Sequence, residues 1–145
     1  MDIYTIGFTK KTAEQFFGAL KKSGVRGLLD IRLKPSSQLA GFAKAADLEY
    51  FLRELCGIEY VPAPLLAPTE EILVGYREKS LDWSKFEMRF RALLSERKVE
   101  QALDRKLFDV PVVLLCSEPT AEKCHRRLVA EYLKEHWTKV TIIHL

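Results

Sequence analysis

Short apolar runs alternate with longer amphipathic segments along the whole of this 145-residue chain. Five runs have the length and composition of strands, at residues 3–6, 27–31, 58–61, 111–115 and 139–143. Residues 112–115 are all apolar, which is typical of a strand buried on both faces of a parallel sheet. The alternation therefore predicts a three-layer α/β domain with a mainly parallel, five-stranded, Rossmann-like sheet.

The segments between the runs carry the marks of helices. Thr12 and Gln15 form a capping-box pattern, and Phe16, Phe17 and Leu20 follow at helical spacing. Right-handed crossovers limit the ways in which such strands can be joined. We expect the strand order 3-2-1-4-5 in one domain spanning residues 1–145, with ligands bound where the first and fourth strands meet.

Composition excludes several classes of protein. A net charge of +3 permits an anionic ligand but does not demand nucleic acid. The N-terminus lacks the pattern of a signal peptide, and no apolar run is long enough to span a membrane. An odd number of cysteines, at Cys56, Cys116 and Cys124, then predicts reduced thiols and a cytoplasmic location.

Polar residues gather where the predicted parallel strands end. They follow the first, second and fourth strands or lie in the helix after the fourth, and if the strand order is right they converge on one crevice. These residues are Gly7, Thr9, Asp30, Arg32, Cys116, Glu118, His125 and Arg126.

The segment from Cys116 to Arg127 is the strongest local signal. A thiol leaves a buried strand, and we expect a helix capped by Thr120 to begin almost at once. The free N–H groups and the dipole of a helix N-terminus favour an anion and lower the pKa of a nearby thiol. Arg126 and Arg127 add forked donors suited to phosphate or carboxylate.

Three functional interpretations of this segment stay open beside a structural one. Cys116 is a nucleophile, or Cys116, Cys124 and His125 bind a metal such as zinc together with Glu118. In the third interpretation an anion binds to arginines and backbone amides while the cysteines only pack. In the structural interpretation both cysteines fill the core and the arginines are solvated.

Several motifs spread along the chain occur in a familiar order. They are Tyr4-Thr5-Ile6-Gly7, Asp30-Ile31-Arg32 with Pro35 and Ser37, Gly57-Ile58-Glu59-Tyr60, Tyr76 with Asp82-Trp83, and Cys116-x-Glu118 with Cys124-His125-Arg126. Together they resemble the prokaryotic family called domain of unknown function 488. That family commonly has a histidine where this chain has Phe8. The resemblance implies the fold and the place of the site, but no reaction.

The leading hypothesis is a binding or catalytic site for an anionic, phosphorylated or nucleotide-like small molecule. Arg32, Arg126 and helix amides would hold the anion, Asp30 or Glu118 would serve as acid or base, and Cys116 would be a nucleophile or metal ligand. We expect Arg126 to be exposed, so that its replacement by alanine leaves the melting temperature nearly unchanged.

Two alternatives come from other classes of protein. One is a nucleic-acid-associated binding module without catalysis, which requires a contiguous basic surface joining Lys34, Arg53, Lys123 and Arg127. The other is a metal-binding regulatory domain. The sequence specifies no cofactor, reaction or oligomeric state.

Overall fold

The computed structural model describes residues 1–36, 41–118 and 120–145. Ser37, from the family-like motifs, lies outside these residues. The strands are β1 (Asp2–Gly7), β2 (Gly27–Asp30), β3 (Glu59–Pro62), β4 (Val112–Cys116) and β5 (Thr141–His144). The α-helices are α1 (Ala13–Ser23), α2 (Ala45–Phe51), α3 (Glu70–Arg77), α4 (Trp83–Arg97), α5 (Val99–Ala102) and α6 (His125–His136).

All the strand pairs of the sheet are parallel, and the strand order is β3-β2-β4-β1-β5. The predicted fold class is confirmed, but the predicted order 3-2-1-4-5 is wrong, because β4 and not β1 lies beside β2. β4 is buried at every residue, and it pairs with β1 through Cys116 and Gly7 and with β2 through Leu115 and Asp30. A right-handed crossover from β1 to β2 can pass over one strand, so the handedness rule does not separate the two orders.

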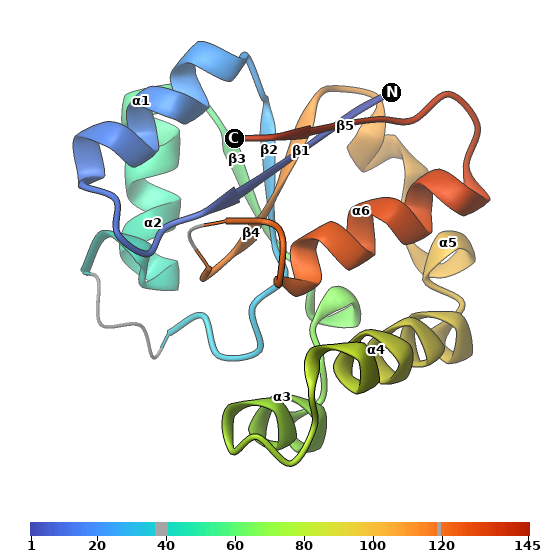
Figure 1. Ribbon diagram of the computed structural model, residues 1–145. Coiled ribbons are helices and arrows are strands. Elements are labelled where there is room, and N and C mark those ends of the chain that lie inside the picture. The colour runs from blue at the N-terminus through green and yellow to red at the C-terminus, as the bar shows by residue number, and fades with distance from the viewer. Residues whose placement is uncertain (37–40, 119) are drawn as a thin grey trace.

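Helices cover both faces of the sheet (Figure 1), where α1 and α2 lie on one side and α4 and α6 on the other. Phe16, Leu20 and Leu48 pack on the first face, and Phe90, Leu128 and Leu133 pack on the second. Burying apolar side chains in both layers supplies the main driving force for this fold. Among the described residues, no helix combines the length and the apolar character needed to cross a membrane.

Helix α6 begins later than the sequence indicated. The capping box of Thr12 and Gln15 at the start of α1 is confirmed, but Thr120 does not cap α6. The helix starts at His125, with Cys124 in the N-cap position and no side-chain capping bond. A loop therefore separates β4 from α6, and it brings Cys124 back towards the end of β4.

Candidate functional site

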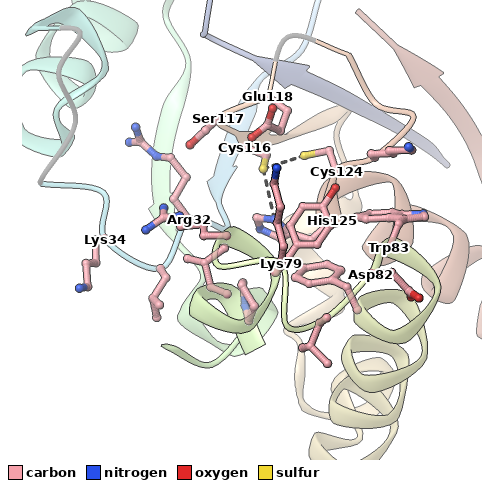
Figure 2. Close-up of a pocket in the computed structure, with 18 residues that line it drawn as sticks. Arg32, Lys34, Lys79, Asp82, Trp83, Cys116, Ser117, Glu118, Cys124 and His125 are labelled. Atoms are coloured by element: carbon pink, nitrogen blue, oxygen red, sulfur yellow. Dashed lines mark hydrogen bonds between the residues drawn. The ribbon is translucent and has the colours of Figure 1, made fainter. Parts of the chain in front are cut away.

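A pocket of about 590 Å³ opens beyond the carboxyl ends of β2 and β4 (Figure 2). Its walls include Arg32 after β2, Cys116 at the end of β4, and Trp83 at the start of α4. The chain leaves β2 towards α2 on one face of the sheet and leaves β4 towards α6 on the other. A crevice forms where the connections after two neighbouring strands run to opposite faces of the sheet. The site therefore lies at the ends of β2 and β4, whereas the sequence led us to expect it where the first and fourth strands meet.

Asp30 and Arg32 form a buried ion pair at one side of this pocket. The Arg32 Nε and Nη2 atoms donate to the two carboxylate oxygens of Asp30 at 2.8 and 2.7 Å. The Tyr60 hydroxyl donates to the same carboxylate at 2.6 Å, and burial followed by this bond raises the pKa of Tyr60. With its oxygens engaged, Asp30 orients the Arg32 guanidinium towards the pocket and is poorly placed for proton transfer.

Cys116, Cys124 and His125 form a buried cluster on the pocket floor (Figure 2). The two sulfur atoms lie 2.7 Å apart, and Cys116 Sγ lies 3.2 Å from His125 Nδ1. The other ring nitrogen of His125, Nε2, lies 2.8 Å from the Ile31 carbonyl oxygen. All three cysteines of the chain are free thiols, and Cys56 lies elsewhere, against the backbone of Phe17.

The two thiols of the cluster differ in acidity. Burial raises the pKa of Cys116, but a hydrogen bond from Cys124, backbone N–H groups of Glu118 and Ser117, and the charge of Arg126 outweigh burial and lower it. Burial, together with the hydrogen bond to Cys116, raises the pKa of Cys124. The Cys124 thiol therefore donates to Cys116, which is the more acidic of the two thiols.

Arg126 lies behind the cluster and not in the pocket. Its side chain is 0% exposed, so the expectation of an exposed Arg126 is wrong. The guanidinium donates to the Glu118 carbonyl oxygen through Nη1 and to Thr5 Oγ1 through Nε. Among the described residues no carboxylate pairs with it, and Nη2 has no hydrogen-bond partner. A buried cation is costly without a nearby negative charge, so the Arg126 guanidinium favours the deprotonated form of Cys116 and lowers its pKa.

Gly7 and Thr9 hold the loop between β4 and α6 in place. The Thr9 backbone N–H donates to the Ser117 carbonyl oxygen at 3.1 Å, and its hydroxyl donates to the same atom. A Cβ atom at Gly7 would overlap the Glu118 carbonyl oxygen and lie 2.5 Å from Arg126 Nη1. These two residues therefore support the site from beneath, and a glycine is needed because the loop backbone touches β1 there.

Replacing Gly7 with alanine should lower the free energy of unfolding by about 2–3 kcal/mol, because the new methyl group forces the loop off β1. Urea unfolding measures the change. Gly18 is the matched control, because it is an exposed glycine within α1 with no atom near its missing Cβ. Gly18→Ala should stabilise the protein by about 1 kcal/mol. Equal effects at the two glycines would contradict the close packing described at Gly7.

A hydrogen-bond chain links Arg126 to the end of β5. Thr5 Oγ1 accepts from Arg126 Nε at 3.3 Å and lies 2.6 Å from His144 Nδ1. The Thr5 hydroxyl can donate its proton to Nδ1 of a neutral His144 imidazole while it accepts from Arg126. Burial, followed by the charges of Arg126 and Arg127, lowers the pKa of His144 below its ordinary value of 6.5.

This chain predicts a dependence of stability on pH. Because the folded-state pKa of His144 is below 6.5, the unfolded chain takes up the proton first, and stability falls as the pH drops from 6.5 through the folded-state pKa. His144→Asn keeps an acceptor for Thr5 but cannot be protonated, so urea midpoints at pH 7.5 and pH 5 should differ less than in the wild type. His136→Asn is the control, and a reduction of the same size there would refute the assignment.

Several residues of the site were not singled out from the sequence. Tyr60, which belongs to a family-like motif but was given no role, binds Asp30, and Arg77 at the end of α3 and Lys79 in the turn after it line the pocket. Lys79 adopts a φ of 61°, which is uncommon outside glycine. The signals were weak, because a tyrosine in a strand and basic residues around the end of a helix are ordinary surface residues in any α/β domain.

The fold and the pocket define a parallel α/β protein with a thiol and histidine cluster at the carboxyl edge of its sheet. A family model described as "Domain of unknown function DUF488" matches residues 12–133, so the chain belongs to this family. No curated protein and no solved structure matches the chain. The matched region includes β2, β4 and the cluster, whereas Gly7 and Thr9 lie before it.

Proposed function

We propose that the pocket binds a small anionic molecule with a planar, apolar part, such as a nucleotide, and that Cys116 and His125 contact the bound molecule. The charge of the pocket lining carries this proposal. The basic residues of the lining are Arg32, Lys34, Arg77, Lys79 and Lys123, and its acidic residues are Asp82 and Glu118.

Asp82, one of the two acidic residues of the pocket lining, is engaged in capping a helix. The Asp82 carboxylate accepts the Lys85 backbone N–H at 2.9 Å as the N-cap of α4. Arg77, Lys79 and Lys123 form no ion pair within the part of the chain that the structure describes. Three cations around a partly enclosed space produce a positive potential that attracts an anion.

An aromatic wall faces the cysteines across the pocket. Trp83 and Phe86 stack with their ring planes 17° apart, and Tyr76 packs edge-on against Trp83 at 5.7 Å between centroids. Such a wall suits a planar ring, and the pocket volume lies within the roughly 300–1,000 Å³ usual for small-molecule sites. The two features together favour a ligand with both a ring and an anionic group.

The site supports different roles for the residues that the sequence suggested as catalytic. Cys116 lies at the pocket floor, which suits contact with a bound ligand, whereas Glu118 is exposed at the rim. Asp30 is held by Arg32 and Tyr60, so we assign it to positioning rather than to acid or base chemistry. Arg126 would act on the ligand only through the cluster that it supports.

The nucleic-acid alternative receives less support. Of its four basic residues, Lys34 pairs with Glu70, Arg53 pairs with Glu54, and Arg127 pairs with Glu87 and Glu131. Ion pairing of this kind reduces the uncompensated charge that a phosphate backbone would neutralise. A binding module for nucleic acid therefore ranks second.

Trp83 provides a direct test of ligand binding. The chain has two tryptophans, and Trp137 packs away from the pocket against Phe108. In a Trp137→Phe background the fluorescence of Trp83 should therefore change saturably when adenosine 5′-monophosphate is added. Adenosine without phosphate should bind about tenfold or more weakly, because the lysines and arginines of the pocket favour the charge.

Charge removal in the pocket provides the matched comparison. Lys79→Gln and Arg77→Gln should each weaken binding of the nucleotide by roughly 3- to 10-fold. Lys98→Gln, at the far end of α4, should not change it. Equal affinity for adenosine and its monophosphate, or no effect of the pocket substitutions, would reject the proposed anionic ligand.

A further inference from the structure

The three donor atoms on the pocket floor are arranged as ligands around one point. Cys116 Sγ, Cys124 Sγ and one His125 ring nitrogen lie within 4.8 Å of one another, and all three residues are buried. Cys116 is the last residue of β4, Cys124 is the N-cap of α6 and His125 is the first residue of α6, so two elements of the core bring them together. Two sulfurs and an imidazole form a donor set that binds thiophilic divalent ions far better than magnesium or calcium.

The hydrogen bond of His125 to the backbone sets its tautomer. The Ile31 carbonyl oxygen only accepts, so the Nε2 atom, 2.8 Å away, carries the ring proton. The Nδ1 atom then has its lone pair free, and it faces Cys116 Sγ at 3.2 Å. Histidines that bind metals usually donate their other ring N–H to a carbonyl or carboxylate in this way, which fixes the ring for coordination.

The charges around the cluster favour deprotonated thiols and an anionic fourth ligand. Arg126 is buried, and its Nη1 lies 3.8 Å from Cys124 Sγ, where it stabilises a thiolate. A dication with two thiolates and a neutral imidazole has no net charge, so Arg126 leaves the whole assembly cationic. A cationic assembly on the floor of a basic pocket favours an anionic group as the next ligand.

We propose that Cys116, Cys124 and His125 bind a thiophilic divalent cation, best matched by Zn²⁺, with one coordination position open to the pocket. Three protein ligands and an open fourth position are typical of catalytic rather than structural zinc sites. Metal binding itself is independent of the proposed function. The second part of the proposal, in which the anionic group of the ligand binds the metal at the open position, rests on the proposed function.

Coordination requires a small rearrangement of Cys124. Tetrahedral zinc, with Zn–S distances of about 2.3 Å, places two thiolate sulfurs roughly 3.8 Å apart. The sulfurs lie 2.7 Å apart in the structure, so they must separate by about 1 Å. Cys124 can make this change, since it precedes the first residue of α6 and its side chain makes no capping bond. Each bound thiolate releases its proton to solvent, and no oxidation occurs.

Cobalt provides the probe for this site. The reduced, chelator-treated protein is titrated anaerobically with Co²⁺ alone, and we expect thiolate-to-cobalt charge-transfer bands and the visible bands of tetrahedral cobalt. Zn²⁺ should displace the cobalt and raise the melting temperature, because an ion that binds only the folded state stabilises it. An octahedral cobalt spectrum without sulfur bands would overturn the proposal.

Variants distinguish ligands from bystanders. Cys116→Ser, Cys124→Ser and His125→Gln should each weaken Zn²⁺ binding, measured by competition with a chromophoric chelator, by more than the roughly 10–100-fold lost with an outer-shell partner. Cys56→Ser is the control, because its thiol lies outside the cluster. Circular dichroism checks folding, and if one variant fails to fold the other two decide. Unchanged affinity in the folded variants would overturn the assignment.

The open position is tested separately. Adding adenosine 5′-monophosphate to the cobalt-loaded protein should shift the visible bands, because a phosphate oxygen enters the coordination sphere. If cobalt binds tetrahedrally but the nucleotide binds without altering the bands, the open position is refuted and the ion is structural. If Trp83 fluorescence shows that no nucleotide binds while cobalt does, the proposed function fails and the metal site stands.

Discussion

Replacing Asp30 with alanine should lower the free energy of unfolding by about 3–5 kcal/mol, because it leaves the Arg32 guanidinium buried without a counter-charge. The pair lies almost wholly inside the protein, with side-chain exposures of 2% for Arg32 and 0% for Asp30. Asp30 also accepts from Tyr60, so a second buried donor loses its partner. Chemical denaturation followed by circular dichroism measures the loss.

The exposed pair of Lys34 and Glu70 is the matched control, because both of its side chains are more than half exposed. Glu70→Ala should leave the unfolding midpoint nearly unchanged, since solvent screens such pairs. The double variant Asp30→Leu with Arg32→Met should be more stable than Asp30→Ala, because it removes both buried charges. An Asp30→Ala variant as stable as the wild type would show that the ion pair of Asp30 and Arg32 does not stabilise the fold.

Replacing Arg126 with alanine should cost about 3–4 kcal/mol, because it opens a cavity in the core and leaves the Glu118 carbonyl oxygen without its donor. The loop from β4 to α6 then loses the link that Arg126 makes between Glu118 and Thr5 of β1, so its backbone amides should exchange with solvent faster. Urea unfolding and hydrogen exchange measure the two effects. The sequence alone led us to expect an exposed Arg126, and therefore almost no loss of stability in Arg126→Ala. An unchanged stability in this variant would contradict the buried role described above.

Arg127 is the control for this substitution, because it is the next residue but is only partly buried, with a side chain 25% exposed that pairs with Glu87 and Glu131. Arg127→Ala should reduce stability much less. Arg126→Met, which fills most of the volume without the charge, should fall between the wild type and Arg126→Ala. Equal losses at the two arginines would contradict a structural role for the buried guanidinium.

Local patterns in the sequence were sufficient to predict most elements of the fold. The capping box at Thr12 fixed the start of α1, and the apolar run at residues 112–115 identified a central strand. Patterns failed at α6, where Thr120 has the chemistry of a cap but does not act as one. The start of α6 is set by the cluster and by Arg126 binding the Glu118 backbone, which are contacts between residues that no local rule connects.

The sequence also marked most residues of the candidate site, because polar groups after apolar strands are visible without coordinates. It placed Cys116, Cys124 and His125 in one segment but left open whether they pack, bind a metal or react. The structure adds that His125 is oriented by Ile31, a residue 94 positions earlier in the chain. It also moves Arg126 from the pocket to the core, because the loop folds its side chain back under Gly7.

By itself, the sequence determined the class of fold, the number of strands and the edge of the sheet at which the candidate site residues gather. These properties follow from periodicity and from the chemistry of short segments, which act over a few residues. Only the tertiary structure decided that β4 lies between β2 and β1, and therefore that the pocket shared by Arg32 and the cysteine cluster opens between directly paired strands. The order of strands depends on which buried faces fit together across the sheet, and that packing is a property of the whole chain.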